Sequence, residues 1–437
     1  MNYDSTIKYL YACAPLFQNV GKDAYKEGLE TTLLLDAHFG HPHHSYKTIH
    51  IAGTNGKGSC SHTIAAILQS AGYKVGLYTS PHLVDFRERI RVNGRPIAKQ
   101  RVIDFIKNEK AFFEPLHPSF FELTTALALL YFKEQKVDVA VIEVGLGGRL
   151  DCTNIIHPLL SIITNISFDH TNLLGNTLAK IAWEKAGIIK HDVPVCIGEY
   201  TAETRPVFDA AAKERETRLI YAEDSKEVLS YKICKRGGID YTTQSFGQIH
   251  GELGGIYQKA NTNTILHAVS QLRQVGLQIE QEHISKGFAK VCSLTHLVGR
   301  WQKLSSHPRT YCDTGHNIAG IQYITNQLLM QDFNQLHIVF GMVNDKDING
   351  VLDILPRHAQ YYFCQASVKR SLDSSNLAQL AWQHKLKGRT FPTVAAAYEA
   401  ARKNATDTDY IYIGGSSYVV ADLLTYIKNC KKNNAGK

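Results

Sequence analysis

The sequence contains no apolar run of 18 or more residues, and its first residues, Met1 to Ser5, show no signal-peptide pattern. These absences argue against a membrane-spanning helix and against secretion. The nine cysteines are scattered, odd in number and contain no C-x-x-C pair, which argues against a disulfide framework and a zinc motif. We therefore expect a soluble, cytoplasmic protein with reduced thiols and no membrane partner.

Basic residues are not gathered on any one segment that would form a nucleic-acid patch. The 48 Lys and Arg exceed the 40 Asp and Glu and give a net charge of +8, but the two signs are interspersed. An anionic small substrate explains this balance equally well, so we expect no nucleic-acid partner. The one basic run, 428–437, is expected to be a solvated, frayed tail.

The chain of 437 residues exceeds the roughly 250–300 residues that one core usually serves, so two domains are expected. We predict an N-terminal domain over 1–297, a linker over 298–303 and a C-terminal domain over 304–437. The fold class is α/β: a first domain with a mostly parallel sheet, then a Rossmann-like domain of alternating strands and helices. We expect a monomer.

A glycine-rich segment follows a short apolar strand, 48–52, and opens onto a predicted helix, 61–69. Positive φ angles expected at its three glycines would turn backbone N–H groups inward, and the helix dipole would add positive potential. Lys57 would reach the β and γ phosphates, and Ser59 would face the phosphates or their Mg²⁺. The predicted ATP cradle comprises Gly53, Thr54, Asn55, Gly56, Lys57, Gly58 and Ser59.

This segment departs from G-x-x-x-x-G-K-[ST] because its front half is shorter and Gly58 stands between Lys57 and the serine. It is therefore a variant P-loop, and we expect the N-terminal domain to be P-loop ATPase-like and to bind ATP. The alternative is an ordinary glycine-rich turn between a strand and a helix, which we consider less plausible because strand, turn and helix are all in place.

Polar residues stand at the ends of two predicted strands further along the chain. Glu143 lies in the strand over 137–144, and Asp169-His170 follow the strand over 159–164. Because the carboxyl ends of parallel strands meet at one edge of a sheet, these groups are expected to converge. Glu143 is a candidate Mg²⁺ ligand, since Mg²⁺ prefers oxygen donors. A lone Glu or His is otherwise more often structural.

Other segments allow two interpretations. The charged stretch 85–97 is either a functional surface loop or a solvated hairpin. The histidines at 41–44 suggest a metal site, but adjacent loop histidines are more often exposed.

Residues 1–47 are expected to be helical up to these histidines, and 193–255 to form short strands. Lys185 stands in the last turn of a predicted helix, 178–186, where a lysine usually complements the helix dipole.

Taken together, these motifs resemble the folylpolyglutamate synthase and dihydrofolate synthase family of the Mur ligase superfamily, over nearly the whole chain. The resemblance rests on Gly53 to Ser59, Thr79 to His82, Glu143 to Asn154, Asp169-His170, Glu184 to Ile188, Gly299-Arg300, Asp313 with His316-Asn317, and Asp345 to Asp347. It implies an ATP-dependent ligase of folate biosynthesis that adds L-glutamate to the carboxylate of a reduced pterin or folate through an acyl phosphate. The acceptor would be dihydropteroate, a reduced folate or both.

The resemblance also implies roles for individual residues. Lys57, His170 and Lys185 would be catalytic, and Lys185 would be carbamylated and help to bind a second Mg²⁺. The first Mg²⁺ would lie at Ser80, Glu143 and His170. Further nucleotide contacts would come from Asn261, Arg300, Asp313 and His316, and pterin contacts from Ser119, Phe120, Phe121, Leu150, Asp151 and Cys152.

The chain departs from the family pattern at a few positions. Thr314-Gly315 stands where the family usually has Gly-Ala, Ile318 replaces a proline, and Val298 replaces a common proline. Two other functions remain open: a different Mur-type amino-acid ligase, and a P-loop NTPase that works as a switch. Chain length and the Ser119 to Glu122 segment argue against the first, and glutamate-dependent ADP release would exclude the second.

Overall fold

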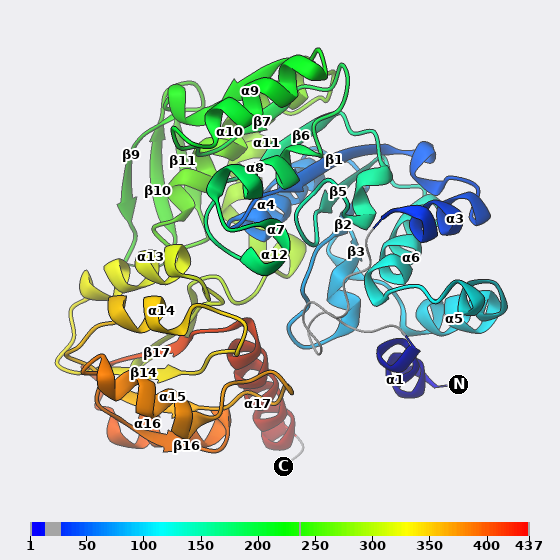
Figure 1. Cartoon of the computed structure of the whole chain (residues 1–437). Coiled ribbons are helices and arrows are strands. Elements are labelled where there is room, and N and C mark those ends of the chain that lie inside the picture. The colour runs from blue at the N-terminus through cyan, green and yellow to red at the C-terminus, as the bar shows by residue number, and fades with distance from the viewer. Residues whose placement is uncertain (1, 14–27, 236, 436–437) are drawn as a thin grey trace. The chain divides into compact units, whose positions relative to one another are not determined.

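The structure is a computed structural model that describes residues 2–13, 28–235 and 237–435 (Figure 1). The chain forms two compact units. The first comprises the described residues up to Cys234, 238–252 and 258–297, and the second comprises Lys235, Gly237, 253–257 and the described residues from Val298 onward. The predicted linker, 298–303, thus falls in the second unit. None of the described helices has the length and apolar character that a membrane crossing requires.

An eight-stranded sheet forms the frame of the first unit, with strand order β4-β3-β2-β5-β1-β6-β7-β8. The strands from β2 to β8 in this order are parallel, and β3 and β4 add an antiparallel edge. The mostly parallel sheet is therefore confirmed. The strands are β1 (Lys47–Ala52), β2 (Val75–Tyr78), β3 (Ile90–Val92), β4 (Arg95–Pro96), β5 (Val139–Glu143), β6 (Leu160–Ile163), β7 (Val195–Ile197) and β8 (Leu219–Tyr221).

Helices cover both faces of this sheet, because successive side chains of a strand point to opposite faces. Val139 and Val141 of β5 pack with helices α4 (Lys57–Ser70), α10 (Gln258–Gln274) and α11 (Gln281–Ala289). Ala140 and Ile142 pack with α5 (Lys99–Phe113) and α6 (Phe120–Glu134) on the other face. Over β6 and β7 this second face is covered by α8 (Leu178–Ala186) and α9 (Arg205–Glu214).

A smaller antiparallel sheet, in the order β11-β10-β9, adds Ile239, Tyr241 and Ile249 to the core under α4. Its strands are β9 (Val228–Ile233), β10 (Ile239–Thr243) and β11 (Gln248–Gly251). The remaining α-helices of this unit are α1 (Tyr3–Cys13), α3 (Glu30–His38), α7 (Thr171–Leu174) and α12 (Val291–Thr295), and its short 3₁₀ helices include η2 (Pro42–Ser45), η3 (Phe86–Arg89) and η5 (Cys152–Ile155).

The second unit is a six-stranded sheet in the order β12-β13-β17-β14-β15-β16, parallel except for the β12–β13 pair. This is the predicted Rossmann-like pattern. The strands are β12 (Gln302–Ser306), β13 (Arg309–Cys312), β14 (Leu336–Phe340), β15 (Gln360–Cys364), β16 (Gly388–Phe391) and β17 (Tyr410–Gly414), and the helices are α13 (Ile318–Leu329), α14 (Ile348–Ile354), α15 (Ser374–Gln383), α16 (Val394–Asn404) and α17 (Ser417–Ala435). The sequence predicts neither β12, which starts inside the expected linker, nor β16.

The charged stretch 85–97 forms a hairpin, as one of the two alternatives predicts, but part of it is buried rather than solvated. It contains η3 and the β3–β4 hairpin, and Arg89 and Arg91 are only 3% and 5% exposed. Arg89 Nε donates to His82 Nδ1 at 2.8 Å, and its guanidinium lies 5.1 Å from the ring centre of Phe120. The sequence does not predict this burial, because buried arginines with partners cannot be distinguished by composition from solvated ones; a functional role for the stretch stays a prediction.

The histidines at 41–44 are not simply exposed. His43 is buried, and the Nδ1 atoms of His41 and His43 lie 2.6 and 2.8 Å from the two carboxylate oxygens of Asp36. Burial raises the pKa of Asp36, but the hydrogen bonds to His43 and His41 outweigh this effect and hold the pKa below its usual value. Hydrogen bonds to Asp36 thus account for His41 and His43 as a structural corner before β1.

Three further expectations can be compared with the structure. Residues 193–255 contain the helix α9 as well as strands. The basic C-terminal run does not fray at once, since α17 continues to Ala435. The predicted N-terminal helices appear as α1 and α3, whereas residues 14–27 between them lie outside the described residues.

Candidate active site

The glycine-rich segment forms the turn between β1 and α4. Gly53 and Gly56 have the predicted positive φ angles, 143° and 86°, and Gly56 is the N-cap of α4. Gly58 does not: it lies in the first turn of α4, which begins at Lys57, four residues before the predicted helix. The first N–H groups of a helix have no carbonyl partner within it, so residues 57–59 present donors at the positive end of the helix dipole.

The front half of the turn is held by the segment that follows β6. The backbone N–H of Thr54 donates to Asn165 O at 2.9 Å, and that of Asn55 to Asn165 Oδ1 at 3.0 Å. The Asn55 carbonyl accepts a hydrogen bond from Thr164 Oγ1 at 2.6 Å. The amides of Thr54 and Asn55 therefore support the turn. The sequence indicates this supporting role only through the position of Thr164 and Asn165 at the end of a predicted strand.

The back half of the turn packs against the first residues of α10. A Cβ atom on Gly56 would lie 2.3 Å from Asn261 Oδ1, so this position requires glycine for space as well as for φ. Asn261 Nδ2 donates to Gln258 Oε1 at 2.9 Å, and Gln258 Nε2 donates to Ser59 Oγ at 3.0 Å. The Ser59 hydroxyl thus has an acceptor bond and keeps its own proton for another oxygen. The sequence indicates Asn261 but not Gln258, because the predicted helix opens two residues too late.

Two lysines converge on the turn. Lys57 Nζ donates to Gly53 O at 2.9 Å and to Thr54 O at 3.1 Å, and Lys185 Nζ donates to the same Gly53 carbonyl at 3.1 Å. Lys185 is only 4% exposed, although it belongs to the last turn of α8. Its burial, and then the positive charge of Lys57, lower the pKa of Lys185 to about 7. A surface lysine that only complements the helix dipole would have neither property.

The predicted Mg²⁺ ligands lie at the ends of neighbouring strands. Glu143 is the last residue of β5 and is buried, and its Oε2 accepts a hydrogen bond from the Ser80 backbone N–H at 3.3 Å. His170 precedes α7 with a φ of 50°, and its backbone N–H donates to Asp169 Oδ1 at 2.9 Å. Strained non-glycine residues of this kind cluster at functional sites. The structure joins Ser80 to Glu143, and the ligand role of all three residues stays a prediction.

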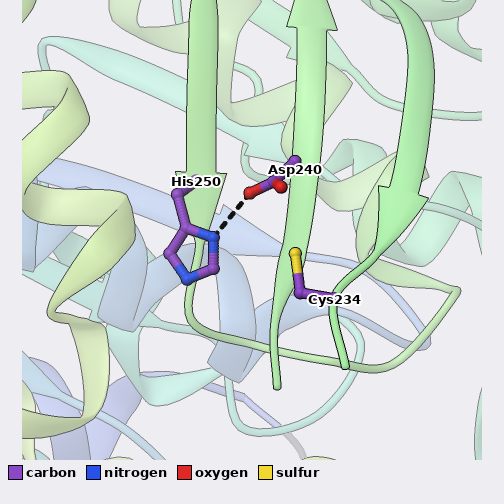
Figure 2. Close-up of side chains that lie close together, drawn as sticks. All are labelled: Cys234, Asp240 and His250. Atoms are coloured by element: carbon purple, nitrogen blue, oxygen red, sulfur yellow. Dashed lines mark hydrogen bonds and ion pairs between the residues drawn. The ribbon is translucent and has the colours of Figure 1, made fainter. Parts of the chain in front are cut away.

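A different group of side chains has the spacing of metal ligands. Among residues 2–13, 28–235 and 237–435, the His, Cys and carboxylate donors within 4.8 Å of one another are those of Cys234, Asp240 and His250 (Figure 2). His250 Nδ1 and Asp240 Oδ1 are 2.7 Å apart, and both side chains are largely exposed on the three-stranded sheet. Glu143 and His170 form no such group. A Mg²⁺ ion there needs oxygens from phosphate or water, which is how Mg²⁺ is usually held.

Two of the predicted pterin-binding residues belong to the framework. Ser119 is the N-cap of α6: its Oγ accepts from Glu122 N at 3.2 Å, and Glu122 Oε2 accepts from Ser119 N at 2.6 Å. Phe120 is buried in the core beneath Arg89. Phe121 is only partly buried and lies against Gly145, where a Cβ atom would come within 2.4 Å of the Phe121 ring. Phe121 is therefore the aromatic residue of this segment that remains accessible.

The loop after β5 carries the other predicted pterin-binding residues. Asp151 is buried, and its carboxylate accepts hydrogen bonds from Thr153 N at 3.0 Å and Leu146 N at 2.8 Å. Burial raises the pKa of Asp151, and these hydrogen bonds oppose the rise. Leu150 is partly buried, and burial holds the pKa of the Cys152 thiol well above its usual range. The Asp151 carboxylate thus fixes the loop from within.

The second unit assembles its predicted nucleotide residues around Asp313. Its Oδ2 accepts hydrogen bonds from Tyr257 Oη and the Trp301 backbone N–H, both at 2.6 Å. Burial raises the pKa of Asp313, while the bond from Tyr257 and the charge of Arg300 act in the opposite direction. The Arg300 guanidinium donates to Thr314 Oγ1, and His316 Nδ1 lies 3.0 Å from Thr314 O. Thr314, which departs from the family pattern, therefore holds Arg300.

Two family models match the chain. The Mur ligase middle domain matches residues 51–261, and the Mur ligase glutamate ligase domain matches residues 299–417. The dihydrofolate synthase/folylpolyglutamate synthase of Bacillus subtilis is 32% identical and aligns over 93% of this chain and 96% of its own length. A probable bifunctional folylpolyglutamate synthase/dihydropteroate synthase of Haloferax volcanii is 34% identical over 97% of this chain, which spans half of that longer protein.

Solved structures show the same fold. Escherichia coli FolC in complex with DHPP and ADP is 30% identical, with a TM-score of 0.83 and 99% of each chain covered. A bifunctional folylpolyglutamate synthase/dihydrofolate synthase with Mn, AMPPNP and L-glutamate bound is 28% identical, with a TM-score of 0.81 and 98% of each chain covered. The likeness in both sequence and structure extends over essentially the full chain.

We expect Gly56→Ala to weaken the binding of the ATP analogue AMPPNP by about tenfold or more, because the added Cβ would displace Asn261 at a typical overpacking cost of about 1–3 kcal/mol. Gly72→Ala is the matched control: its φ of 89° is almost the same, and its Cβ would meet no described atom within 4 Å. Backbone strain should lower the free energy of unfolding by about 1–2 kcal/mol in both variants, and overpacking should lower it further in Gly56→Ala. Calorimetric titration measures the affinity, and equal losses in both variants would contradict the role of Gly56.

Proposed function

Because the chain belongs to the folylpolyglutamate synthase and dihydrofolate synthase family of Mur ligases, we propose that it is an ATP-dependent ligase that joins L-glutamate to a pterin carboxylate. The observation that carries this proposal is the P-loop at the end of β1, where Lys57, the first turn of α4 and Ser59 form a cradle for phosphate. Relatives solved with ADP and DHPP, or with AMPPNP and L-glutamate, support the same substrate set.

The proposed reaction has two displacements. A carboxylate oxygen of the pterin substrate attacks the γ-phosphorus, the bond to the β-γ bridging oxygen breaks, and ADP leaves as the acyl phosphate forms. The glutamate amine then attacks the acyl carbon, the C–O bond to phosphate breaks, and the amine loses a proton as the amide forms. The protein acts mainly by positioning and charge neutralisation, for which Lys57 and the α4 N-terminus are suited.

Ser80, Glu143 and His170 would hold Mg²⁺ beside the cradle, and bound Mg²⁺ would supply neutralising charge to the phosphate oxygens. A second Mg²⁺ site would involve Lys185. The neutral amine of Lys185 would add to the carbon of CO₂ and release a proton to form a carbamate, which replaces a cation by an anionic oxygen donor. Carbamylation needs a neutral amine, and the pKa of about 7 produced by burial and by Lys57 supplies one at physiological pH.

The remaining assignments follow the family resemblance. Phe121 and Asp151 would contact the pterin, and Arg300, Asp313 and His316 would contact the nucleotide. The protein would act as a monomer without a nucleic-acid partner.

The test of the proposed function offers the purified protein ATP, Mg²⁺ and L-glutamate with dihydropteroate or a reduced folate and identifies the products by mass. A product heavier than the acceptor by one or more glutamate residues is expected, with ADP release that depends on both acceptor and glutamate. A P-loop switch would instead release ADP without either substrate, and this result would refute the ligase assignment.

We expect Lys57→Ala to lower kcat by on the order of 10²-fold or more, since one preorganised charge-stabilising group is typically worth that much. The free energy of unfolding should change little, because Lys57 bonds to carbonyl groups at the turn and fills no core. Steady-state kinetics and urea denaturation measure the two quantities. Activity within a few-fold of the wild type would contradict the assignment of the cradle to ATP.

Glu143→Gln removes an anionic oxygen at constant volume and should raise the Mg²⁺ concentration for half-maximal rate by about tenfold or more. Glu122→Gln is the matched control, because Glu122 is also buried and glutamine preserves its capping bond at α6. The Glu122 variant should keep the wild-type Mg²⁺ midpoint. An unchanged midpoint in Glu143→Gln would mean that this carboxylate is structural.

Lys185→Ala should be nearly inactive, and acetate should restore part of the rate by placing a carboxylate in the vacated space. Lys185→Arg should stay inactive with acetate because its permanent cation remains. In the wild type, activation by added CO₂ should strengthen as the pH rises through about 7, where the amine becomes neutral.

Lys190→Ala is the matched control for acetate rescue. The pKa of Lys190 is also lowered, to about 8, by burial and then by Arg215, but its Nζ donates to Asn154 O rather than to the P-loop. Acetate should not restore this variant. Full activity of Lys185→Arg would refute the carbamate.

A further inference from the structure

His50 is a buried polar residue in the middle of the central strand β1. Its neighbours Ile49 and Ile51 point into the core under α4, whereas His50 points to the opposite face. The His50 side chain is completely buried, and its Nε2 lies 2.8 Å from the hydroxyl oxygen of Thr153. The imidazole therefore connects the strand that leads into the P-loop with the loop that follows β5.

The other hydrogen bonds of Thr153 show which atom is the donor in its hydrogen bond with His50. The Thr153 hydroxyl donates to Asp151 Oδ1 at 2.5 Å, and the Thr153 backbone N–H donates to the same oxygen at 3.0 Å. A hydroxyl has one proton, so the Thr153 oxygen must accept its remaining bond from a His50 N–H. Burial, with a smaller effect of Lys190, lowers the pKa of His50 to about 3, so the neutral ring carries its single proton on Nε2.

The chain of hydrogen bonds from His50 through Thr153 ends on the Asp151 carboxylate, which also holds the turn at 145–148 after β5. Asp151 Oδ2 accepts from Leu146 N at 2.8 Å, so one carboxylate links Thr153 to the turn of 145–148. The far side of this loop is held separately, since Asn154 Nδ2 donates to Arg149 O and Gly187 O, both at 3.0 Å. His50 thus acts on the Asp151 side and Gly187 on the other.

We propose that His50 is a positioning residue that orients the Asp151 carboxylate through Thr153 and so fixes the pterin-binding loop relative to the P-loop. The proposal rests on the proposed function, in which Asp151 contacts the pterin. Gly53 directly follows β1 and is three residues from His50, which on an extended backbone is a separation of about 10 Å. A strand in the middle of a sheet is rigid. A side chain on it can therefore hold the pterin-binding loop at a fixed distance from the phosphate cradle.

The test compares variants that remove single members of the chain. His50→Leu removes the donor, and Thr153→Val removes the hydroxyl at nearly constant shape, which guards against a folding defect at His50. His50→Gln keeps an N–H donor and is the conservative variant. Ser161→Ala is the matched control, because Ser161 pairs with His50 in the sheet, is equally buried and bonds to Ile188 O instead of the loop.

Three quantities are measured: KM for the pterin acceptor, Kd for AMPPNP, and hydrogen–deuterium exchange of residues 145–155. His50→Leu and Thr153→Val should each raise the acceptor KM by about tenfold, as expected for a lost buried hydrogen bond, and speed exchange in 145–155. Kd for AMPPNP should stay within about twofold. The double variant should be no worse than the more damaged single variant, because both act in one chain, and His50→Gln should recover most of the KM.

Acceptor KM and loop exchange in His50→Leu equal to those of Ser161→Ala would overturn the proposal. So would an AMPPNP affinity that falls in the same proportion as the acceptor affinity, because His50 would then act on the P-loop in general. A wild-type protein that glutamylates no pterin would refute the proposed function instead, while faster exchange of 145–155 in His50→Leu would still establish the positioning contact.

Discussion

Two ammonium groups share one carbonyl oxygen, that of Gly53, and much of the site depends on this arrangement. Lys57 reaches the carbonyl from the first turn of α4, and Lys185 reaches it from the last turn of α8. The two Nζ atoms lie 2.9 and 3.1 Å from this oxygen. Two positive charges held so close together repel, and burial removes the water that would screen them. The site can relieve that repulsion by binding an anion or by giving up a proton from Lys185. The same constraint therefore favours phosphate at the cradle and a neutral amine beside it.

The geometry that brings these lysines together depends on β1. Because β1 is flanked by the parallel strands β5 and β6, Glu143, the P-loop and the segment containing Asp169 and His170 all emerge at one edge of the sheet. The supports of the turn come from the same strands, since Thr164 and Asn165 after β6 hold Asn55. One sheet edge thus supplies both the groups that would meet phosphate and the groups that hold them in place.

Periodicity and strand-end position predicted the elements that carry the site, because those elements are buried and their sequences follow the pattern of burial. Gly58 shows where this reasoning stops: glycine is compatible with a turn and with a helix, and its φ depends on where α4 starts. The strands β12 and β16 were missed because they lie at the edges of their sheet, with mixed polar and apolar residues. Gln258 was missed for another reason, since its contact with Ser59 joins residues 199 positions apart.

Residues that the family resemblance assigns to ligands separate, in the structure, into two physical classes. Ser119 caps a helix, Phe120 fills a core, and Asp313 gathers donors from Tyr257, Trp301 and Gly315. Lys57, Lys185 and Glu143 instead place charge at a shared sheet edge, where folding alone gains little from it. Replacing a residue of the first class removes a partner from a buried group and lowers stability together with activity. Replacing a residue of the second class removes a charge that costs the fold free energy, so activity falls without an equal loss of stability. Measuring activity and stability on each variant therefore separates the two classes.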